Sequence, residues 1–293
     1  MLSEFHLIFV IALVLSWTCG TVLNSSIVAV YLSDWKKGLN LGACNGIILA
    51  MGCTNLLLQW FLTFHLMSLT YQLFIIFAKP LLLSVVSFIV NFSVSLSFWL
   101  TAWLSGYYCV RLVNSSNRFF IRLKRGMSMV VTYCLLGTVV TLFIIQVPVI
   151  WKVHTKLNQN LTNIYSAFDN YTELASVNAT FACFLPTIIT SFCIGLSLIS
   201  LLKHIWRLKQ NASQFWNPQL KNHFKACRTM LLLLTVNLIF FLAISISFRY
   251  KLDDPRQYVA WFIMSSNPSS QAVILLFGNS RLATAWSKVL FSH

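Results

Sequence analysis

Charged residues are scarce in this chain: only 9% of its 293 residues are charged, and only 6 are acidic. A soluble protein of this length would be about 25% charged, so an ordinary soluble domain is excluded. A transmembrane helix needs about 20 mostly apolar residues, and seven stretches without any Asp, Glu, Lys or Arg reach that length. The sequence therefore predicts an all-α integral membrane protein with seven transmembrane helices. The uncharged stretches are 5–33, 38–78, 80–110, 126–151, 174–202, 229–248 and 257–280.

Basic residues are distributed unevenly between these stretches, and their distribution indicates the orientation. Short cytoplasmic loops hold an excess of Lys and Arg. With seven helices, 15 of the 21 basic residues fall on one side and 6 on the other. Of the acidic residues, only Asp34 lies on the basic side. We therefore expect an outer N-terminus and an inner C-terminus. The net charge is +15. We attribute it to basic inner loops that meet anionic lipid or an acidic partner protein, and not to nucleic-acid binding.

The stretch 38–78 leaves the number of spans open. As a single helix its 41 residues would extend roughly 60 Å. It could hold one span and an apolar outer loop, or two spans. Two spans would reduce the split of basic residues to 13 against 8, so seven spans fit better.

The expected architecture is one seven-helix domain over residues 1–293. Its long outer loop carries glycosylation sequons at Asn160 and Asn170, whereas the sequon at Asn211 lies inside and should stay unmodified. The expected spans are 5–32, 40–63, 81–110, 127–150, 181–206, 226–248 and 258–280, with an outer loop at 151–180, inner loops at 33–39, 111–126 and 207–225, and an inner tail at 281–293.

The residues and motifs typical of catalysis and of ion-coupled transport are missing from the sequence as well. Ionisable residues inside spans are costly and are kept for function, and here the spans hold none apart from histidines. No HExxH, GxSxG or Walker-type loop is present, so we expect no enzyme. The eight cysteines contain no CxxC and no outer pair, so neither a metal site nor an outer disulfide is expected. What remains is a helix bundle that binds something near its outer half and changes shape at its inner face.

Several motifs at the inner ends of the predicted spans carry a family resemblance. Residues 99–116 read WLTAWLSGYYCVRLVNSS, and residues 200–204 read SLLKH. Residues 223–229 read HFKACRT, and residues 268–282 read PSSQAVILLFGNSRL. In these motifs the chain resembles the bitter taste receptors, the type 2 taste receptor family of G-protein-coupled receptors. The resemblance implies a plasma-membrane receptor for small bitter compounds that activates a gustducin-like heterotrimeric G protein and uses no cofactor.

The chain departs from the family pattern at two places, which marks it as a divergent member. Asn55 replaces an Arg of the second span, and Gln271 with Ala272 replaces a His-Ser pair of the seventh. The rhodopsin-like signatures Asp-Arg-Tyr, Cys-Trp-x-Pro and Asn-Pro-x-x-Tyr are absent. A type 1 vomeronasal (pheromone) receptor is the alternative among receptors, and a small multi-span transporter is the alternative from another class.

By this resemblance, the ligand pocket lies between the outer halves of the third, fifth, sixth and seventh helices. Phe240 of the sixth helix is expected to face Asn91 and Trp261 across a dry cavity, with Met264 on the same face as Trp261. An aromatic residue at 261 and a small apolar residue at 90 favour neutral over cationic ligands. Simple helix packing would explain the same pattern. On the third helix five pocket residues form one stripe at helical spacing: Ser87, Val90, Asn91, Val94 and Ser95.

Residues near the inner ends of the spans are expected, from the same resemblance, to hold the resting state or to contact the G protein. For Arg122 and Lys124, the positive-inside rule alone is an equally good explanation. The expected coupling residues are Tyr108, Arg111, Arg122, Lys124, His204, His223 and Lys225.

Overall fold

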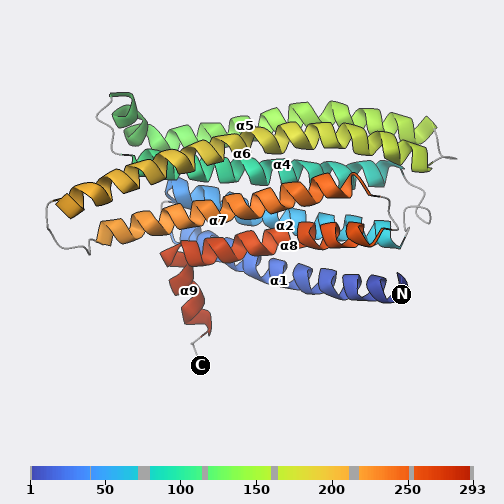
Figure 1. The fold of residues 1–293 in the computed structure, drawn as a ribbon, viewed down its shortest axis with the longest axis horizontal. Helices are drawn as coiled ribbons and strands as arrows, with labels where there is room; N and C mark the ends of the chain where they lie inside the picture. The colour runs from blue at the N-terminus through green and yellow to red at the C-terminus, as the bar shows by residue number, and fades with distance from the viewer. Residues whose placement is uncertain are drawn as a thin grey trace.

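The computed structural model describes residues 2–39, 41–71, 80–113, 118–159, 164–210, 218–250 and 254–290, and every regular element in these ranges is an α-helix. Seven long helices of this part lie side by side, and the short helix α9 crosses their direction (Figure 1). The predicted all-α bundle is confirmed. The helices are α1 (Leu2–Lys36), α2 (Ala43–Thr70), α4 (Pro80–Leu112), α5 (Arg118–Gln159), α6 (Ile164–Gln210), α7 (Pro218–Ser247), α8 (Pro255–Gly278) and α9 (Ser280–Leu290).

Six of the long helices are apolar enough to cross a membrane by composition alone, namely α1, α2, α4, α5, α6 and α7. The seventh, α8, has 24 residues and is about 36 Å long, but it is rich in Ser, Asn and Gln. Its polar side chains at Ser265, Asn267 and Gln271 are buried inside the bundle. Polar residues that face other helices can hydrogen-bond there, which explains how a polar sequence fits within the bundle.

The structure describes the ambiguous stretch 38–78 as one helix over most of its length, because α2 runs unbroken from Ala43 to Thr70. Several other helices are longer than the expected spans. The segment 151–180, expected to be a loop, is helical up to Gln159 and again from Ile164. No Gly or Pro occurs between Pro148 and Pro186, so neither of the two strongest helix-breaking residues is present where α5 and α6 extend beyond the expected spans.

Part of each remaining expected loop is also helical. The expected inner loop 207–225 is helical to Gln210 and from Pro218, and α5 already begins at Arg118 within the expected loop 111–126. The expected inner tail folds as α9. Of the sequons, Asn170 lies on α6, whereas Asn160 and Asn211 lie outside the described residues.

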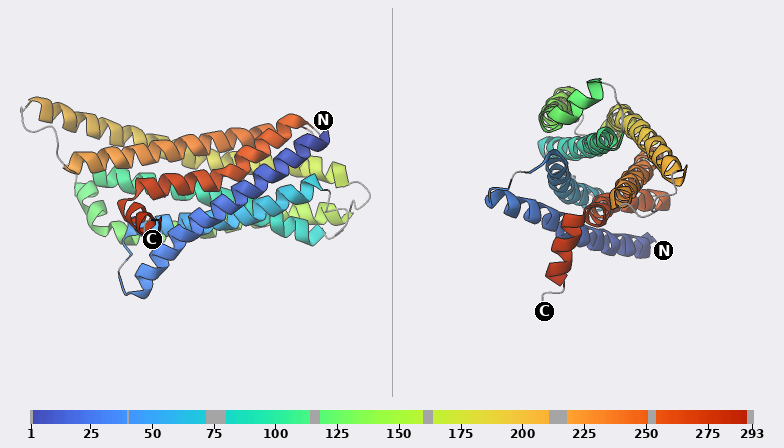
Figure 2. Two further views of the ribbon diagram at one scale, coloured as in Figure 1. Left: turned by 90° about the horizontal axis from the view of Figure 1, so that it is seen from below. Right: turned by 90° about the vertical axis from the view of Figure 1, so that its left-hand side faces the viewer.

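The end of the bundle at which α1 begins is named the outer end here, as the charge distribution predicts, and the opposite end is the inner end. Helix α4 lies at the centre and contacts α2, α5, α6 and α7. Helix α1 packs against α2 and α8, so the first and last long helices are neighbours (Figure 2). Small buried serines on α4 let its neighbours approach closely: Ser84, Ser87, Ser93, Ser95, Ser97 and Ser105.

A capped turn begins α8 at the outer end. The Asp254 side chain accepts a hydrogen bond from the Arg256 backbone N–H at 2.9 Å and pairs with the Arg256 guanidinium at 2.7 Å. The guanidinium also lies over the Tyr250 ring, 3.9 Å from its centroid. The hydrogen bonds from the Arg256 side chain and then from its backbone N–H hold the pKa of the Asp254 carboxyl below its usual value. Arg256 thereby connects Tyr250 to the start of α8.

A sharp corner at Asn279 separates α8 from α9. Asn279 is extended, with φ −110° and ψ 119°, and its side-chain oxygen accepts a hydrogen bond from the Arg281 backbone N–H at 2.9 Å. Its side-chain amide donates to the Tyr31 hydroxyl on α1 at 3.0 Å. An Asn at this position is a good N-cap, so it ends one helix and starts the next.

Candidate ligand pocket and helix-coupling network

Apolar side chains from α4, α7 and α8 converge in the outer half of the bundle. The Phe240 ring of α7 is 1% exposed, and its centroid lies 6.1 Å from that of Phe98 on α4 at an interplanar angle of 34°. Both rings belong to one buried cluster with Trp261 of α8. The structure brings into or against this cluster five of the residues predicted for the pocket: Val90, Val94, Phe240, Trp261 and Met264.

Two of the other predicted pocket residues of α4, Asn91 and Ser95, accept hydrogen bonds from α5. The Gln146 amide of α5 donates to the Ser95 hydroxyl at 2.9 Å and to the Asn91 backbone carbonyl at 3.3 Å. The Asn91 amide donates to the Ser87 carbonyl of its own helix at 2.8 Å. The predicted single stripe therefore divides in two, because residues one position apart lie about 100° apart around a helix. Gln146 is a buried polar residue that sequence reasoning missed.

Two of the three residues expected around a cavity, Phe240 and Trp261, belong to the same buried cluster, whereas the Asn91 amide bonds within α4. Phe98, which the prediction did not include, packs its ring against Phe240. A ligand at this place would have to separate aromatic rings that now contact one another.

Helix α1 extends the aromatic cluster, which the sequence reasoning did not foresee. The Trp261 ring centroid lies 5.6 Å from that of Tyr258 and 6.0 Å from that of Phe9 on α1. His6, one turn before Phe9, hydrogen-bonds through Nε2 with the Tyr258 hydroxyl. The available signal was the spacing of Tyr258 and Trp261, which places both rings on one face of α8. The candidate pocket is thus bordered by α1 as well as by α4, α7 and α8.

A buried network of neutral polar side chains connects the same three helices, α4, α7 and α8. The Gln271 amide nitrogen lies 2.9 Å from Asn237 Oδ1, 3.0 Å from Ser97 Oγ and 3.1 Å from Asn267 Oδ1. The Asn237 amide in turn donates to the Thr101 hydroxyl at 3.1 Å. All of these residues are buried. In the sequence, Gln271 stood out only as a departure from a family motif. The signal for the network was that polar residues four positions apart lie on one face of a helix, as Ser97 and Thr101 do on α4 and Asn267 and Gln271 on α8.

A second polar seam holds α1 and α2 against α8, beside Pro268. Proline inside a helix removes one backbone hydrogen bond, and nearby carbonyls of α8 find partners on other helices. The Asn24 amide donates to the Pro268 carbonyl at 3.1 Å. The Ser265 carbonyl accepts from the Ser16 hydroxyl at 2.8 Å and from the Gln59 amide at 3.3 Å. This seam fixes the position of α8 relative to α1.

The comparisons with known proteins decide the family. The family model described as Taste receptor protein (TAS2R) matches residues 1–293. The chain is 28% identical to the putative taste receptor type 2 member 33 of Homo sapiens, over 97% of this chain and 94% of that protein. It is 26% identical to taste receptor type 2 member 13 of Pan troglodytes, over 95% and 94%. It is 27% identical to taste receptor type 2 member 30 of Pongo pygmaeus, over 99% and 92%.

The chain belongs to the TAS2R taste receptor family. The resemblance read from the motifs is therefore confirmed. As a member of this family the protein is a bitter taste receptor of the G-protein-coupled class and a multi-pass protein of the plasma membrane.

The helix ends that carry the predicted coupling residues of this TAS2R protein, namely the ends of α4 and α6 and the starts of α5 and α7, lie at the inner end of the bundle (Figure 1). Tyr108 is partly buried and accepts a hydrogen bond from the Cys44 thiol of α2 at 3.5 Å. Arg111 is exposed and donates to the Tyr107 hydroxyl at 3.0 Å. The side chain of His204 lies outside the described part of the chain. Of the remaining residues, two are exposed at the start of α5 and two are partly buried at the start of α7: Arg122, Lys124, His223 and Lys225.

Proposed function

We propose that this TAS2R receptor binds small, neutral bitter compounds among the outer aromatic cluster and activates a gustducin-like heterotrimeric G protein at its inner end. One observation carries the proposal. The three helices that the buried network around Gln271 joins, α4, α7 and α8, each contribute an aromatic ring to the cluster: Phe98, Phe240 and Trp261. A ligand that displaces the aromatic rings would therefore also change the geometry of the hydrogen bonds around Gln271.

The chemistry of the cluster favours a neutral ligand. Its rings and aliphatic side chains, including Val90, Phe98, Phe240 and Trp261, offer large apolar contact area. Aromatic side chains contribute to binding by stacking with ligand rings as well as by apolar burial. The sequence stretches that supply Val90, Phe98, Phe240 and Trp261, residues 80–110, 229–248 and 257–280, contain no Asp, Glu, Lys or Arg, so a cationic amine would be buried there without a counter-charge from these helices, which is costly.

The network around Gln271 is suited to change state when the helices move. A side-chain amide has two N–H hydrogens, and the Gln271 nitrogen faces three acceptors, on Ser97, Asn237 and Asn267. The two hydrogens can be redistributed among these acceptors at little cost. A small displacement of α7 against α4 would favour one distribution over another, and the same helices carry the proposed coupling residues Tyr108, Arg111, His223 and Lys225 at their inner ends.

The proposal includes the orientation and the glycans expected from the sequence. With α1 beginning outside, Asn160 and Asn170 can be glycosylated and Asn211 cannot. Digestion with an N-glycosidase should lower the apparent mass of the wild-type receptor. Asn160→Gln/Asn170→Gln should already run at the lower mass. A glycan on Asn211 would reverse the orientation.

Calcium release in transfected cells tests the function directly. The receptor is expressed with a gustducin-chimeric α-subunit and exposed to neutral aromatic or terpenoid bitter compounds and to cationic alkaloids. We expect responses to neutral compounds at lower concentrations than to alkaloids, and no response with an α-subunit lacking the gustducin C-terminal segment. Stronger responses to the alkaloids would contradict the ligand chemistry, and equal responses with both α-subunits would contradict the coupling.

A further inference from the structure

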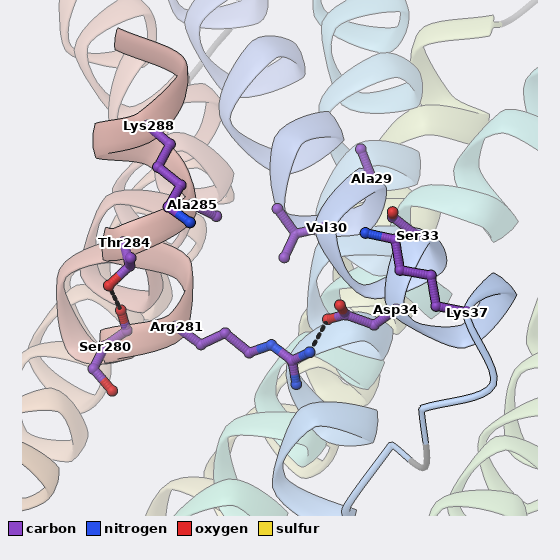
Figure 3. A pocket seen from close by; sticks show the side chains of 10 residues that line it. All are labelled: Ala29, Val30, Ser33, Asp34, Lys37, Ser280, Arg281, Thr284, Ala285 and Lys288. Carbon is purple, nitrogen blue, oxygen red and sulfur yellow. Dashed lines mark hydrogen bonds and ion pairs between the residues drawn. The ribbon is translucent and has the colours of Figure 1, made fainter. Parts of the chain in front are cut away.

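A cleft of about 720 Å³ lies at the inner end of the receptor, between the end of α1 and the side of α9 (Figure 3). It is far along the bundle from the outer aromatic cluster and shares no residue with it. Ala29, Val30 and Ala285 give the cleft an apolar floor, and Lys37, just after the end of α1, and Lys288 of α9 stand on opposite sides of its rim. An apolar floor below a basic rim is the pattern of an amphiphilic ligand site.

The end of α1 is built to hold Lys37 in place. Gly38 has a φ of 72°, in the left-handed region that glycine adopts without a steric penalty. Its N–H donates to the Trp35 carbonyl at 3.0 Å, and the Leu39 N–H donates to the Asp34 carbonyl at 3.1 Å. These two bonds form the Schellman motif that ends many helices. The backbone at Lys37 is therefore fixed at the rim, with its basic side chain at the negative end of the helix dipole.

Helix α9 presents one face to α1 and another to the bundle. Arg281, Ala285 and Lys288 recur at i, i+4 and i+7, the spacing of one helical face, and all three line the cleft. Leu282 is buried and Trp286 packs against the inner core. The helix runs roughly perpendicular to the long helices and points away from the bundle (Figure 2), so it lies along the predicted cytoplasmic surface of the membrane.

The charges of the cleft leave two ammonium groups available. Arg281 is paired with Asp34 at 2.7 Å, and this ion pair connects α9 to α1 across the cleft. Within the residues that the structure describes, neither Lys37 nor Lys288 has an ion-pair partner, and both ammonium groups point into the gap between the helices (Figure 3). With one acidic and three basic side chains, the lining carries a net positive charge.

We propose that this cleft binds an anionic phospholipid of the cytoplasmic leaflet, with the headgroup phosphate between Lys37 and Lys288 and an acyl chain beside Ala29 and Val30. The continuation of the same surface toward the outer end supports a lipid, because Val22 on α1 is 60% exposed on the outside of the bundle. Basic pockets on the cytoplasmic side of membrane helices attract anionic headgroups. A soluble anion would use the two ammonium groups but would gain nothing from the apolar floor.

The site goes beyond the proposed recognition of bitter compounds and does not depend on it; it depends on the predicted orientation. A lipid between α1 and α9 would hold α9 against the bundle together with the Asp34–Arg281 pair. Because α9 follows α8 directly at Asn279, the lipid would also restrain the inner end of α8.

Native mass spectrometry of the purified full-length receptor tests the site. The receptor is titrated with phosphatidylinositol 4,5-bisphosphate, phosphatidylserine and phosphatidylcholine, and with the soluble headgroup inositol trisphosphate. Lys37→Ala/Lys288→Ala should weaken binding of the anionic lipids about ten- to thirtyfold, the factor that two basic side chains contribute near an anionic phosphate. Lys203→Ala/Lys221→Ala is the matched control, because both lysines are exposed at the same end but outside the cleft; we expect less than a twofold change.

Ala29→Trp separates a lipid from a soluble anion and leaves the charges unchanged. Ala29 is an exposed residue of the apolar floor, so the bulky ring should block the acyl chain without disturbing the core. We expect it to weaken lipid binding at least fivefold and to leave any binding of inositol trisphosphate unchanged.

Three results would overturn the proposal. These are equal binding of phosphatidylcholine and the anionic lipids, an equal loss in the cleft variant and the matched control, or soluble headgroup binding as tight as lipid binding with no effect of Ala29→Trp. Melting temperatures within about 2 °C of wild type identify the variants that are folded for this comparison. Should the double lysine variant not fold, Ala29→Trp and the lipid-selectivity series decide alone.

Discussion

The Gln271 amide of α8 donates a hydrogen bond to Asn237 Oδ1 of α7 at 2.9 Å, and both side chains are buried. The contact joins two helices in the interior of the receptor. It is made entirely by neutral groups, where the family motif has a titratable histidine. We therefore expect the network to keep its hydrogen bonds unchanged across the physiological pH range.

Replacing Gln271 should loosen the bundle. Gln271→Leu keeps the side-chain size but leaves Asn237 Oδ1 and Asn267 Oδ1 without this donor. Unsatisfied buried polar groups cost about 1–3 kcal/mol, so we expect a lower melting temperature for the purified receptor. Ser270→Ala is the neighbouring control, because within the described part of the chain the Ser270 hydroxyl bonds only to the Ser266 carbonyl of its own helix. Equal melting temperatures for Gln271→Leu and wild type would show that the network does not stabilise the receptor.

Asn24 and Asn55 form a matched pair with opposite expected outcomes. Both are 0% exposed. Asn24 donates to the carbonyls of Gly20 and Pro268 at 2.9 and 3.1 Å, whereas neither polar atom of the Asn55 amide has a partner among the described residues. Asn24→Leu should therefore lower the free energy of unfolding by about 1–3 kcal/mol, and Asn55→Leu should raise it by a similar amount. Thermal unfolding in detergent measures both, and a destabilised Asn55→Leu would reveal a partner for this amide.

Gly278 is required by the close approach of α8 to α7. A Cβ at this position would lie 2.6 Å from Thr229 Oγ1 and 2.8 Å from Thr229 Cγ2. Overpacking of this kind costs about 1–3 kcal/mol, so Gly278→Ala should lower the melting temperature. Thr229→Ala removes both atoms and should rescue part of the loss, which a double-mutant cycle measures. Gly137→Ala is the control, because nothing lies within 4 Å of its added Cβ. If the effects of Gly278→Ala and Thr229→Ala simply add in the double variant, the clash between the new Cβ and Thr229 is relieved in another way.

Phe240 should affect agonist potency. The side chain is fully packed, so Phe240→Ala would itself cost about 3–5 kcal/mol of stability; Phe240→Leu keeps most of the apolar volume and removes the ring. Loss of ring stacking should raise the half-maximal agonist concentration about ten- to hundredfold in the calcium assay. Phe192→Ala on α6 is the control, because that ring is 66% exposed on the outer surface of the bundle. Unchanged potency of Phe240→Leu for several unrelated agonists would assign Phe240 to helix packing alone.

Arg111 should affect signalling and leave ligand binding intact. Its guanidinium is exposed at the inner end and bonds within its own helix to Tyr107. Arg111→Ala should therefore lower the maximal calcium response at unchanged surface expression, with the half-maximal concentration within about threefold of wild type. Lys36→Ala, also exposed and basic at the inner end, should retain the full response. A similar loss in both variants would point to the general positive charge of the inner surface.

The sequence predicted the features that depend on local composition. Long uncharged stretches identify spans because a charge in the membrane is costly wherever the span packs, and the motifs around Tyr108 and His223 identified the family. Helix ends were less predictable, because the polar segment before Thr180 has the composition of a loop and yet contains no residue that breaks a helix.

Side-chain partners could not be predicted, because they depend on how the helices are rotated against one another. Ser95 was expected to face the pocket, and it bonds to Gln146, 51 positions away. Ser97 and Gln271 are 174 positions apart. A rotation of α4 by about 100°, a single residue step, would move both serines away from these partners. Hydrophobic periodicity does not resolve a rotation of that size in a helix whose sides are nearly all buried.

The contact of α1 with α8 has a consequence for biosynthesis. The first long helix leaves the ribosome early, yet the Pro268 carbonyl that its Asn24 bonds and the Ser265 carbonyl that its Ser16 bonds belong to a helix made more than 200 residues later. Until that helix is inserted, Asn24 and Ser16 face lipid or the translocation machinery with part of their hydrogen bonding unmet. The nascent chain therefore stays in the endoplasmic reticulum membrane without the contacts between α1 and α8. These contacts form only after α8, its last long helix, has been inserted.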